Sequence, residues 1–217
     1  MEFTDVMKKR QSVRDFDRHK EIPKDQLTQI VKTAQLTPSW ANSQPWRVYI
    51  ARSKTLDQIR DHHLKLTQQG QPGQPEMPVL SQRAWGPAPA SNTNRWFSDF
   101  NQYMAGADPS VFGQAQAHLF NASALVYLTA QKQFSDWMAY DIGAFGQSLM
   151  LAATDLGIDS IPAYEIIKYP TGIHQIMNIP DTELVVAGIA LGYRTNSQIN
   201  GFRSGRVPTN EILTIKD

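Results

Sequence analysis

The sequence has 217 residues, of which 41% are hydrophobic and 19% charged, a composition typical of one large globular domain or two small ones. Because 21 lysines and arginines face 20 aspartates and glutamates, the formal net charge is +1, which excludes a broad field for nucleic acid or anionic lipid and leaves any anion site local. The sequence contains no cysteine, which excludes disulfides, thiolate metal sites, iron–sulfur clusters and a cysteine nucleophile.

The first ten residues mix acids and bases and lack an apolar run of signal-peptide length. The most apolar stretch, 137–156, is interrupted by Asp141, Gln147 and Asp155, which favours a buried helix over a membrane span. We therefore expect a soluble, cytoplasmic protein with no membrane or nucleic-acid partner.

The first part of the chain predicts an α-β-α opening. Apolar residues recur at helical spacing before Arg10, and a second helix should begin after Pro23 and end before Pro38, which disfavours helical geometry in the residue preceding it. Residues 46–51 alternate as in a strand, and Ser53 is expected to cap a third helix.

Residues 67–107 form an insertion rich in Gln, Pro, Gly and Ser that also carries scattered aromatic residues. Because disordered segments are usually poor in aromatics, this insertion is expected to pack on something, as a lid or as part of a subunit contact. The sequence does not predict its path.

Strands and helices alternate in the second half. The pattern predicts a buried strand at 124–130, a long helix at 137–156 stopped by Gly157, a strand at 158–162, a helix at 171–177 and a strand at 184–191. Gly143 and Gly146 lie on one face of the long helix and would admit another backbone, such as that of a symmetry mate. We predict one α+β domain over residues 1–217, because the strands are too few for a barrel.

The end of the chain is a polar connector followed by a short apolar run, 212–215. Such a run needs a sheet edge to bury against, and an edge on a partner subunit is one plausible acceptor.

Three constellations are candidates for chemistry. Arg10-Gln11-Ser12-Val13-Arg14 can surround a phosphate, although arginine-rich turns are also common on solvated surfaces. The loop 38–46 offers amides, hydroxyls and two indoles to a flat heterocycle, although it also fits an ordinary connector whose tryptophans fill the core. Pro162-Ala163-Tyr164-Glu165 can support a planar ring, although it also fits an ordinary strand end, and Arg203 and Arg206 near the end of the chain also fit a solvated tail.

Metal and hydrolytic sites have little support. The five histidines include no pair at i,i+3 or i,i+4 spacing, so no metal site is expected. The sequence also lacks a G-x-S-x-G elbow, a Walker loop and G-x-G-x-x-G.

Together, the motif at 10–14 and the later Pro38-Ser39-x-x-Asn42-x-Gln44-Pro45-Trp46 resemble the FMN-dependent nitroreductase family in content and spacing. Further matches are Trp137-Met138-Ala139, the segment from Leu156 to Pro162, the strand from Gly188 to Tyr193, and Arg206-Val207-Pro208. The resemblance covers nearly the whole chain except the insertion.

The resemblance implies an α+β fold with a mixed, largely antiparallel central sheet flanked by helices, in an intertwined homodimer with an exchanged C-terminal segment. FMN would lie at the interface, its phosphate held by Arg10, Ser12, Arg206 and Arg203, with Arg14 near the pyrimidine edge. The implied cofactor-binding residues are Arg10, Gln11, Ser12, Arg14, Pro38, Ser39, Trp40, Asn42, Gln44, Pro162, Ala163, Tyr164, Glu165, Arg203 and Arg206.

Some details of the implied site differ from the usual family pattern. Pro38, Ser39, Trp40 and Asn42 would come from the partner chain, and a backbone N–H of Tyr164 or Glu165 would meet flavin N5. Many members have an acid followed by glycine at the latter place, so the donor is open by one residue. Some members also have lysine where this chain has Ser204, a role that Arg203 is expected to fill.

The implied function is an NAD(P)H-dependent FMN oxidoreductase. Hydride from NADH or NADPH would reach flavin N5 and then nitroaromatic, quinone or similar planar acceptors by a ping-pong mechanism, without a catalytic side chain. Trp40, Trp96 and Phe97 are candidates for the substrate wall. The alternatives are a flavin storage or sensing protein, a flavin-dependent dehalogenase, and an α+β binding module without flavin.

Overall fold

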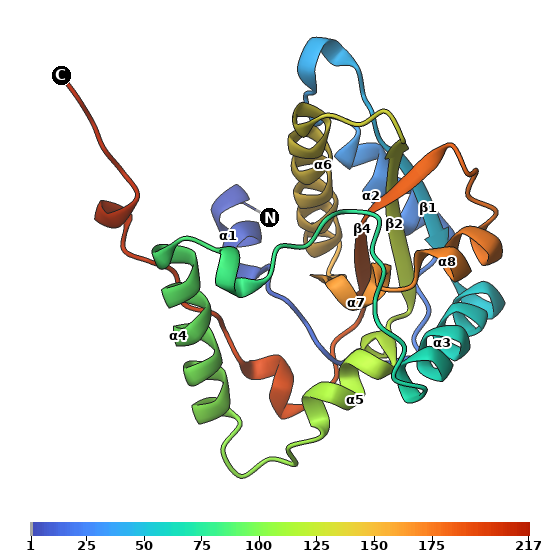
Figure 1. The fold of residues 1–217 in the computed structure, drawn as a ribbon, viewed down its shortest axis with the longest axis horizontal. Helices are drawn as coiled ribbons and strands as arrows, with labels where there is room; N and C mark the ends of the chain where they lie inside the picture. Colours follow the sequence, from blue (N-terminus) through green and yellow to red (C-terminus); the bar gives the residue numbers. More distant parts are fainter. Residues whose placement is uncertain (1) are drawn as a thin grey trace.

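A four-stranded antiparallel sheet forms the centre of the computed structural model, which describes residues 2–217 (Figure 1). The strand order is β1-β2-β4-β3, and the strands are β1 (Arg47–Ala51), β2 (Ala124–Gln131), β3 (Asp159–Pro162) and β4 (Glu183–Gly192). Each strand pair is antiparallel, and the parallel element of the predicted mixed sheet is a single bridge between Ser12 and Ser160 beside β3.

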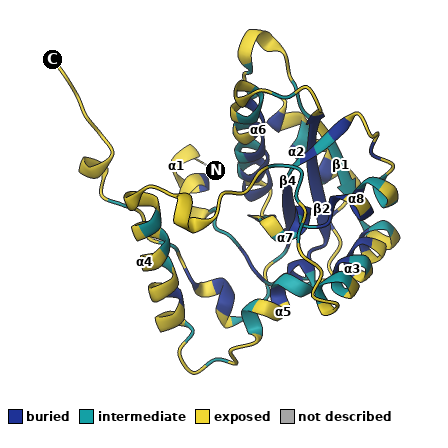
Figure 2. Cartoon of the chain, in the orientation of Figure 1, coloured by how far each residue is buried: buried dark blue, intermediate teal, exposed yellow. Residues whose placement is uncertain are grey.

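The two central strands are buried on both faces, which explains why β2 reads as a continuous apolar run. On β2, Leu125 and Tyr127 pack into one hydrophobic cluster, whereas Val126 and Leu128 pack into a second cluster across the sheet. Figure 2 shows this buried centre between more exposed helices. The predicted α+β fold is confirmed.

Helices cover both faces of the sheet. The α-helices of the described chain are α1 (Phe3–Lys9), α2 (Lys24–Ala34), α3 (Ser53–Gln68), α4 (Pro87–Tyr103), α5 (Val111–Ala117), α6 (Asp136–Asp155), α7 (Tyr164–Ile167) and α8 (Pro170–Met177). Apolar residues of α2 and α6 pack on one face, and those of α3, α5, α7 and α8 pack on the other. None of the helices formed by residues 2–217 is long and apolar enough to cross a lipid bilayer.

One local prediction is wrong, and another fails at one of its two residues. The N-cap of α3 is Arg52, without a side-chain capping bond, and the Ser53 hydroxyl instead contacts Glu21 Oε1 at 3.3 Å. Gly146 faces the chain's own sheet, where a Cβ atom would lie 3.3 Å from Leu128, whereas Gly143 faces open space. Gly146 therefore serves packing within the chain and is not available to a symmetry mate.

The insertion contains α4, which packs against the C-terminal part of the same chain. Phe100 joins Ile199 and Phe202 in a third hydrophobic cluster, with Trp96 and Phe112 packed against it. Figure 1 shows α4 beside the red C-terminal segment, away from the sheet.

The final residues lead away from the sheet (Figure 1). The apolar side chains of Ile212, Leu213 and Ile215 are 74%, 55% and 76% exposed. Among residues 2–217, no strand of the chain pairs with this tail.

Candidate functional site

A cleft of about 470 Å³ brings together arginines from both ends of the chain, and we call it the arginine cleft. Its lining residues are Met7, Lys8, Arg10, Gln11, Ser12, Arg14, Gln147, Phe202, Arg203, Ser204 and Arg206. The six predicted residues of the terminal segments, Arg10, Gln11, Ser12, Arg14, Arg203 and Arg206, thus share one site.

The N-terminal wall of the cleft is an extended segment beside β3, whose side chains point alternately into the core and into the cleft. α1 ends at Lys9, and the chain then extends so that Val13 donates its N–H to Ser160 O at 3.1 Å. Val13 is fully buried in the core. Because side chains alternate along an extended segment, Ser12 and Arg14 point to the opposite side from Val13.

Asn200 ties the two walls together, and sequence reasoning missed it. Its Oδ1 accepts the backbone N–H groups of Arg14 at 2.8 Å and Asp15 at 3.1 Å, and its Nδ2 donates to Asp15 O at 2.7 Å. Its own carbonyl accepts Gln11 Nε2 at 2.8 Å. Asn200 is 4% exposed, so these bonds are made away from water. An asparagine in a polar connector gives no sequence signal for such a role.

Within residues 2–217, the guanidinium groups in the cleft have no carboxylate partner. Among the ion pairs formed by residues 2–217, none includes Arg10, Arg14, Arg203 or Arg206. Burial and the nearby charge of Arg206 lower the pKa of Arg10, and burial lowers the pKa of Arg14. The cleft therefore holds positive charge that is partly desolvated and uncompensated, an arrangement that favours an anion.

One buried acceptor in this site is also unsatisfied. Gln11 Oε1 is inaccessible to water and has no hydrogen-bond partner within the described part of the chain. An unpaired buried amide oxygen is costly, so a ligand with a hydroxyl or N–H donor would be stabilised here.

The predicted ring shelf lies beside the cleft and not in its lining. Pro162 ends β3 two positions after Ser160, and Ala163 donates its N–H to Gly188 O at 3.1 Å. A Cβ at Gly188 would lie 2.4 Å from Ile166, so glycine permits this close packing of α7. Tyr164 and Glu165 occupy the first turn of α7, where backbone N–H groups have no intrahelical acceptor.

The side chain of Glu165 is turned towards α3. Lys168 Nζ donates to its Oε2 at 3.1 Å, and His63 Nε2 lies 3.5 Å from the same oxygen without a hydrogen bond. Burial, followed by the nearby charge of Lys168, lowers the pKa of His63 from 6.5 to about 4. The imidazole is therefore neutral at pH 7, which explains why the contact with Glu165 is not an ion pair.

The predicted loop 38–46 lies apart from the arginine cleft within one chain. Ser39 Oγ accepts Gln44 N at 2.9 Å, Gln44 Nε2 donates to Asn42 Oδ1 at 3.2 Å, and Trp40 N donates to Asp141 Oδ2 at 3.1 Å. Trp40 itself is 66% exposed. The loop thus has a fixed backbone and presents an indole to the surroundings.

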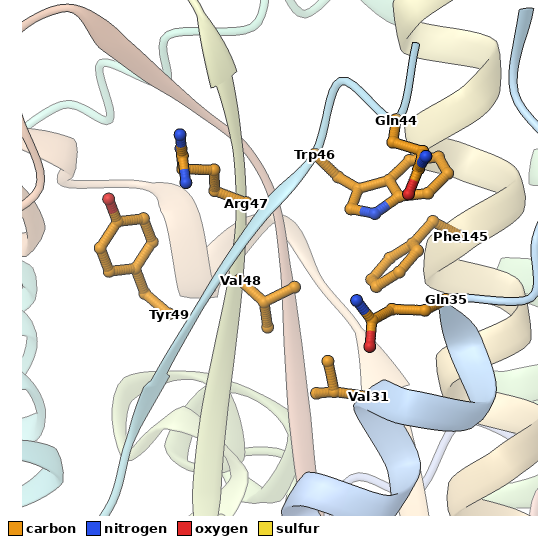
Figure 3. Close-up of a pocket in the computed structure, with 8 residues that line it drawn as sticks. All are labelled: Val31, Gln35, Gln44, Trp46, Arg47, Val48, Tyr49 and Phe145. Atoms are coloured by element: carbon orange, nitrogen blue, oxygen red, sulfur yellow. The ribbon is translucent and has the colours of Figure 1, made fainter. Parts of the chain in front are cut away.

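Trp46 packs against the core, as expected for a tryptophan in an ordinary connector. Its indole stacks on Phe145 with a centroid distance of 4.7 Å and, with Gln44 and Val48, lines a separate pocket of about 430 Å³ (Figure 3). Figure 3 also shows Arg47 and Tyr49 pointing away from Phe145, as expected for alternate residues of β1.

The predicted substrate residues on α4 differ in their surroundings. Trp96 Nε1 donates to Ser204 Oγ at 2.8 Å, so its ring reaches the C-terminal wall of the cleft, whereas Phe97 is 44% exposed. Within residues 2–217, no group of three or more His, Asp or Glu side chains is placed to hold a metal ion.

Comparisons with known proteins agree on one family. The model of the nitroreductase family matches residues 7–193. Chloronitrobenzene nitroreductase from Comamonas testosteroni is 25% identical over 97% of this chain and 95% of its own length. The solved structure of the FMN-dependent nitroreductase NfnB from Mycobacterium smegmatis in complex with NADPH has a TM-score of 0.90 at 20% identity, covering 99% of this chain and 97% of that one. A nitroreductase with bound FMN from Desulfitobacterium hafniense has a TM-score of 0.65, also at 20% identity, covering 100% and 99%.

The buried His63 generates a prediction about stability and pH. The unfolded chain takes up a proton near pH 6.5, whereas the folded chain does so only near pH 4, so stability should fall as the pH falls through this window. The contribution of one such group is at most about 1.4 kcal/mol per pH unit. Urea unfolding of His63→Asn between these pH values should show a flatter dependence than the wild type, and an equal slope in both proteins would contradict the assignment.

Proposed function

The chain belongs to the nitroreductase family, and on that premise we propose that it is an FMN-dependent oxidoreductase that uses NADH or NADPH to reduce nitroaromatic, quinone or similar planar acceptors. The observation that carries the proposal is the arginine cleft, which gathers cations from both chain ends without a carboxylate to neutralise them. The names of the relatives, which include a chloronitrobenzene nitroreductase and an FMN-dependent NfnB, support the same cofactor and acceptor class.

The residues of the cleft fit FMN. A phosphate between Arg10 and Arg206 would relieve the repulsion that lowers the pKa of Arg10. The unsatisfied Gln11 Oε1 would accept a bond from a hydroxyl of the ribityl chain or from a ring N–H. The cofactor therefore complements both the charge and the hydrogen-bonding deficit of the site.

We propose a role for each residue of the cleft. Arg10, Ser12, Arg203 and Arg206 would hold the phosphate, and Arg14 would lie at the pyrimidine edge of the ring. When bound, FMN would supply the redox chemistry, hydride uptake at N5 and hydride transfer to the acceptor in a ping-pong sequence.

The remaining groups of the chain would orient the ring. Pro162 and Ala163 would support one face of it, and the N–H of Tyr164 or Glu165 would bond at N5. Positive charge held by Arg14 near the ring would favour its anionic reduced form.

The second wall of the site is proposed to come from another copy of the chain. Pro38, Ser39, Trp40, Asn42 and Gln44 lie outside the arginine cleft of their own chain, on a loop whose hydrogen bonds hold it in one shape. In a homodimer this loop would complete the partner's site. The exposed Trp40 would then face the acceptor, together with Trp96 and Phe97.

The C-terminal tail is proposed to join the dimer by strand exchange. β1 is an edge strand, and a groove of about 400 Å³ lies beside it. The groove is lined by the apolar residues Leu27, Val31, Val48 and Ile50 of α2 and β1, together with polar and charged residues of α2 and with Arg52. The exposed apolar side chains of Ile212, Leu213 and Ile215 are chemically suited to the apolar residues of this groove. A partner's tail would cover the edge, and its own apolar side chains would leave water.

The function is tested by mixing the purified protein with FMN and then with NADH or NADPH in a stopped-flow spectrometer. After unbound FMN is removed by gel filtration, we expect the protein to retain the flavin absorption near 450 nm. This band should bleach with at least one nucleotide and return when a nitroaromatic or quinone is added. Bound flavin that neither nucleotide bleaches within a minute would indicate the storage or sensing alternative. A protein that binds no FMN would contradict the proposal.

The arginines at the two chain ends can be tested separately. Arg10→Ala and Arg206→Ala should each weaken FMN binding by roughly 1.5–3 kcal/mol, because each removes a charge-assisted bond to phosphate. Fluorescence titration measures this, with Arg83→Ala, an exposed arginine outside the cleft, as the control. Wild-type affinity in both cleft variants would overturn the phosphate assignment.

The exchanged tail can be tested by truncation. Deleting residues 210–217 should weaken the dimer, because the apolar run that covers the partner's β1 edge is lost. Light scattering over a range of protein concentrations measures the change, and Ile212→Asp in the full-length chain should weaken it in the same direction. A truncated chain as dimeric as the wild type would refute strand exchange.

A further inference from the structure

Arg14 is the most enclosed cation of the arginine cleft, and aromatic rings from the insertion cover it. The residue is 7% exposed, and its guanidinium carbon lies 5.5 Å from the ring centre of Trp96 and 5.9 Å from that of Phe100. Both rings belong to α4. Within the described residues, these are the two aromatic rings placed against this guanidinium.

The aromatic pair is itself rigidly held. Trp96 and Phe100 stack with an interplanar angle of 7° and a centroid distance of 5.2 Å, and Phe202 packs edge-on against both. The hydrogen bond from Trp96 Nε1 to Ser204 Oγ joins the pair to the C-terminal wall of the cleft. The rings are thus fixed relative to the segment that carries Arg203 and Arg206.

Polar contacts alone hold the Arg14 side chain weakly. Nη1 donates to Ser12 O at 3.1 Å, which uses one of five N–H donors, and no carboxylate of residues 2–217 pairs with the group. A long side chain with one bond retains several rotamers in water, whereas rings beside a guanidinium favour the one in which cation and ring faces meet. Burial of the guanidinium lowers the pKa of Arg14.

We propose that Trp96 and Phe100 are positioning residues that hold the Arg14 guanidinium at the pyrimidine edge of FMN, so that the insertion of this chain sets the affinity and the reduction potential of its flavin. The inference rests on the proposed function, because it requires FMN in the arginine cleft. It assigns to α4 a role inside the site besides that of a wall for the acceptor.

A double-mutant cycle tests the proposal on full-length protein. Trp96→Leu removes the ring, Arg14→Met removes the cation while keeping a long side chain, and the double variant combines them. Phe112→Leu is the matched control, because Phe112 packs on Phe100 in the same cluster at 5.2 Å and loosens the aromatic packing without removing a ring from Arg14. The measurements are FMN dissociation constants by fluorescence titration, midpoint potentials by dye equilibration, and thermal unfolding.

Trp96→Leu is expected to weaken FMN binding about threefold to thirtyfold, the range that corresponds to cation–π contacts, and to make the midpoint potential more negative. In the Arg14→Met background the same substitution should change neither quantity, because the group that the ring positions is gone. Phe112→Leu should lower thermal stability but keep the wild-type affinity and potential.

Three results would overturn the inference. Equal effects of Trp96→Leu with and without Arg14 would show that the ring acts independently of the cation. A Phe112→Leu protein that loses affinity as strongly as Trp96→Leu would show that only general packing matters. A wild-type protein that binds no FMN would remove the proposed function as well, whereas the first two results leave that function standing.

Discussion

The arginine cleft depends on one buried amide. Asn200 accepts the N–H groups of Arg14 and Asp15 and donates to the carbonyl of Asp15, so it closes the backbone of the first wall onto the segment that forms the second. Asp15 adds a bond from Thr195 Oγ1 at 2.6 Å. Because both polar atoms of the buried Asn200 side chain are bonded to the first wall, the two walls are held in one arrangement. A chain with a net charge of only +1 can thus concentrate positive charge at a single place.

Concentrating unpaired cations opposes folding, and the fold limits this cost in two ways. Arg206 remains exposed and keeps part of its hydration, while Arg14 exchanges water for ring faces and a carbonyl. The repulsion between Arg10 and Arg206 remains, and it favours the binding of an anion between them. Binding such an anion would stabilise the folded chain by mass action, so cofactor affinity and protein stability are linked in this site.

The sequence predicted what depends on local pattern and failed where distant contacts decide. The apolar run of β2 and the helix stop at Gly157, with φ of 75°, were readable because periodicity and glycine conformation are local properties. The cleft arginines were found through motifs at both chain ends. The role of Asn200 and the path of α4 were not predicted, because both depend on contacts with residues far away in the sequence. Ser53 misled because Glu21, remote in sequence, captures its hydroxyl.

Three features of the single chain are not explained by its own contacts, and all three favour the proposed homodimer. The loop with Trp40 is internally bonded yet exposes its indole, the edge of β1 borders an apolar groove, and the apolar tail lies in water. Each feature alone is ordinary on a protein surface. Together they match the proposed two-fold dimer, in which every copy would place its tail on the β1 edge of the partner and receive the partner's tail on its own β1 edge. α4 already fills the cleft side nearest Arg14 within the chain. The loop of a second copy would therefore close the remaining side, and the insertion and the partner would divide the enclosure of one flavin between them.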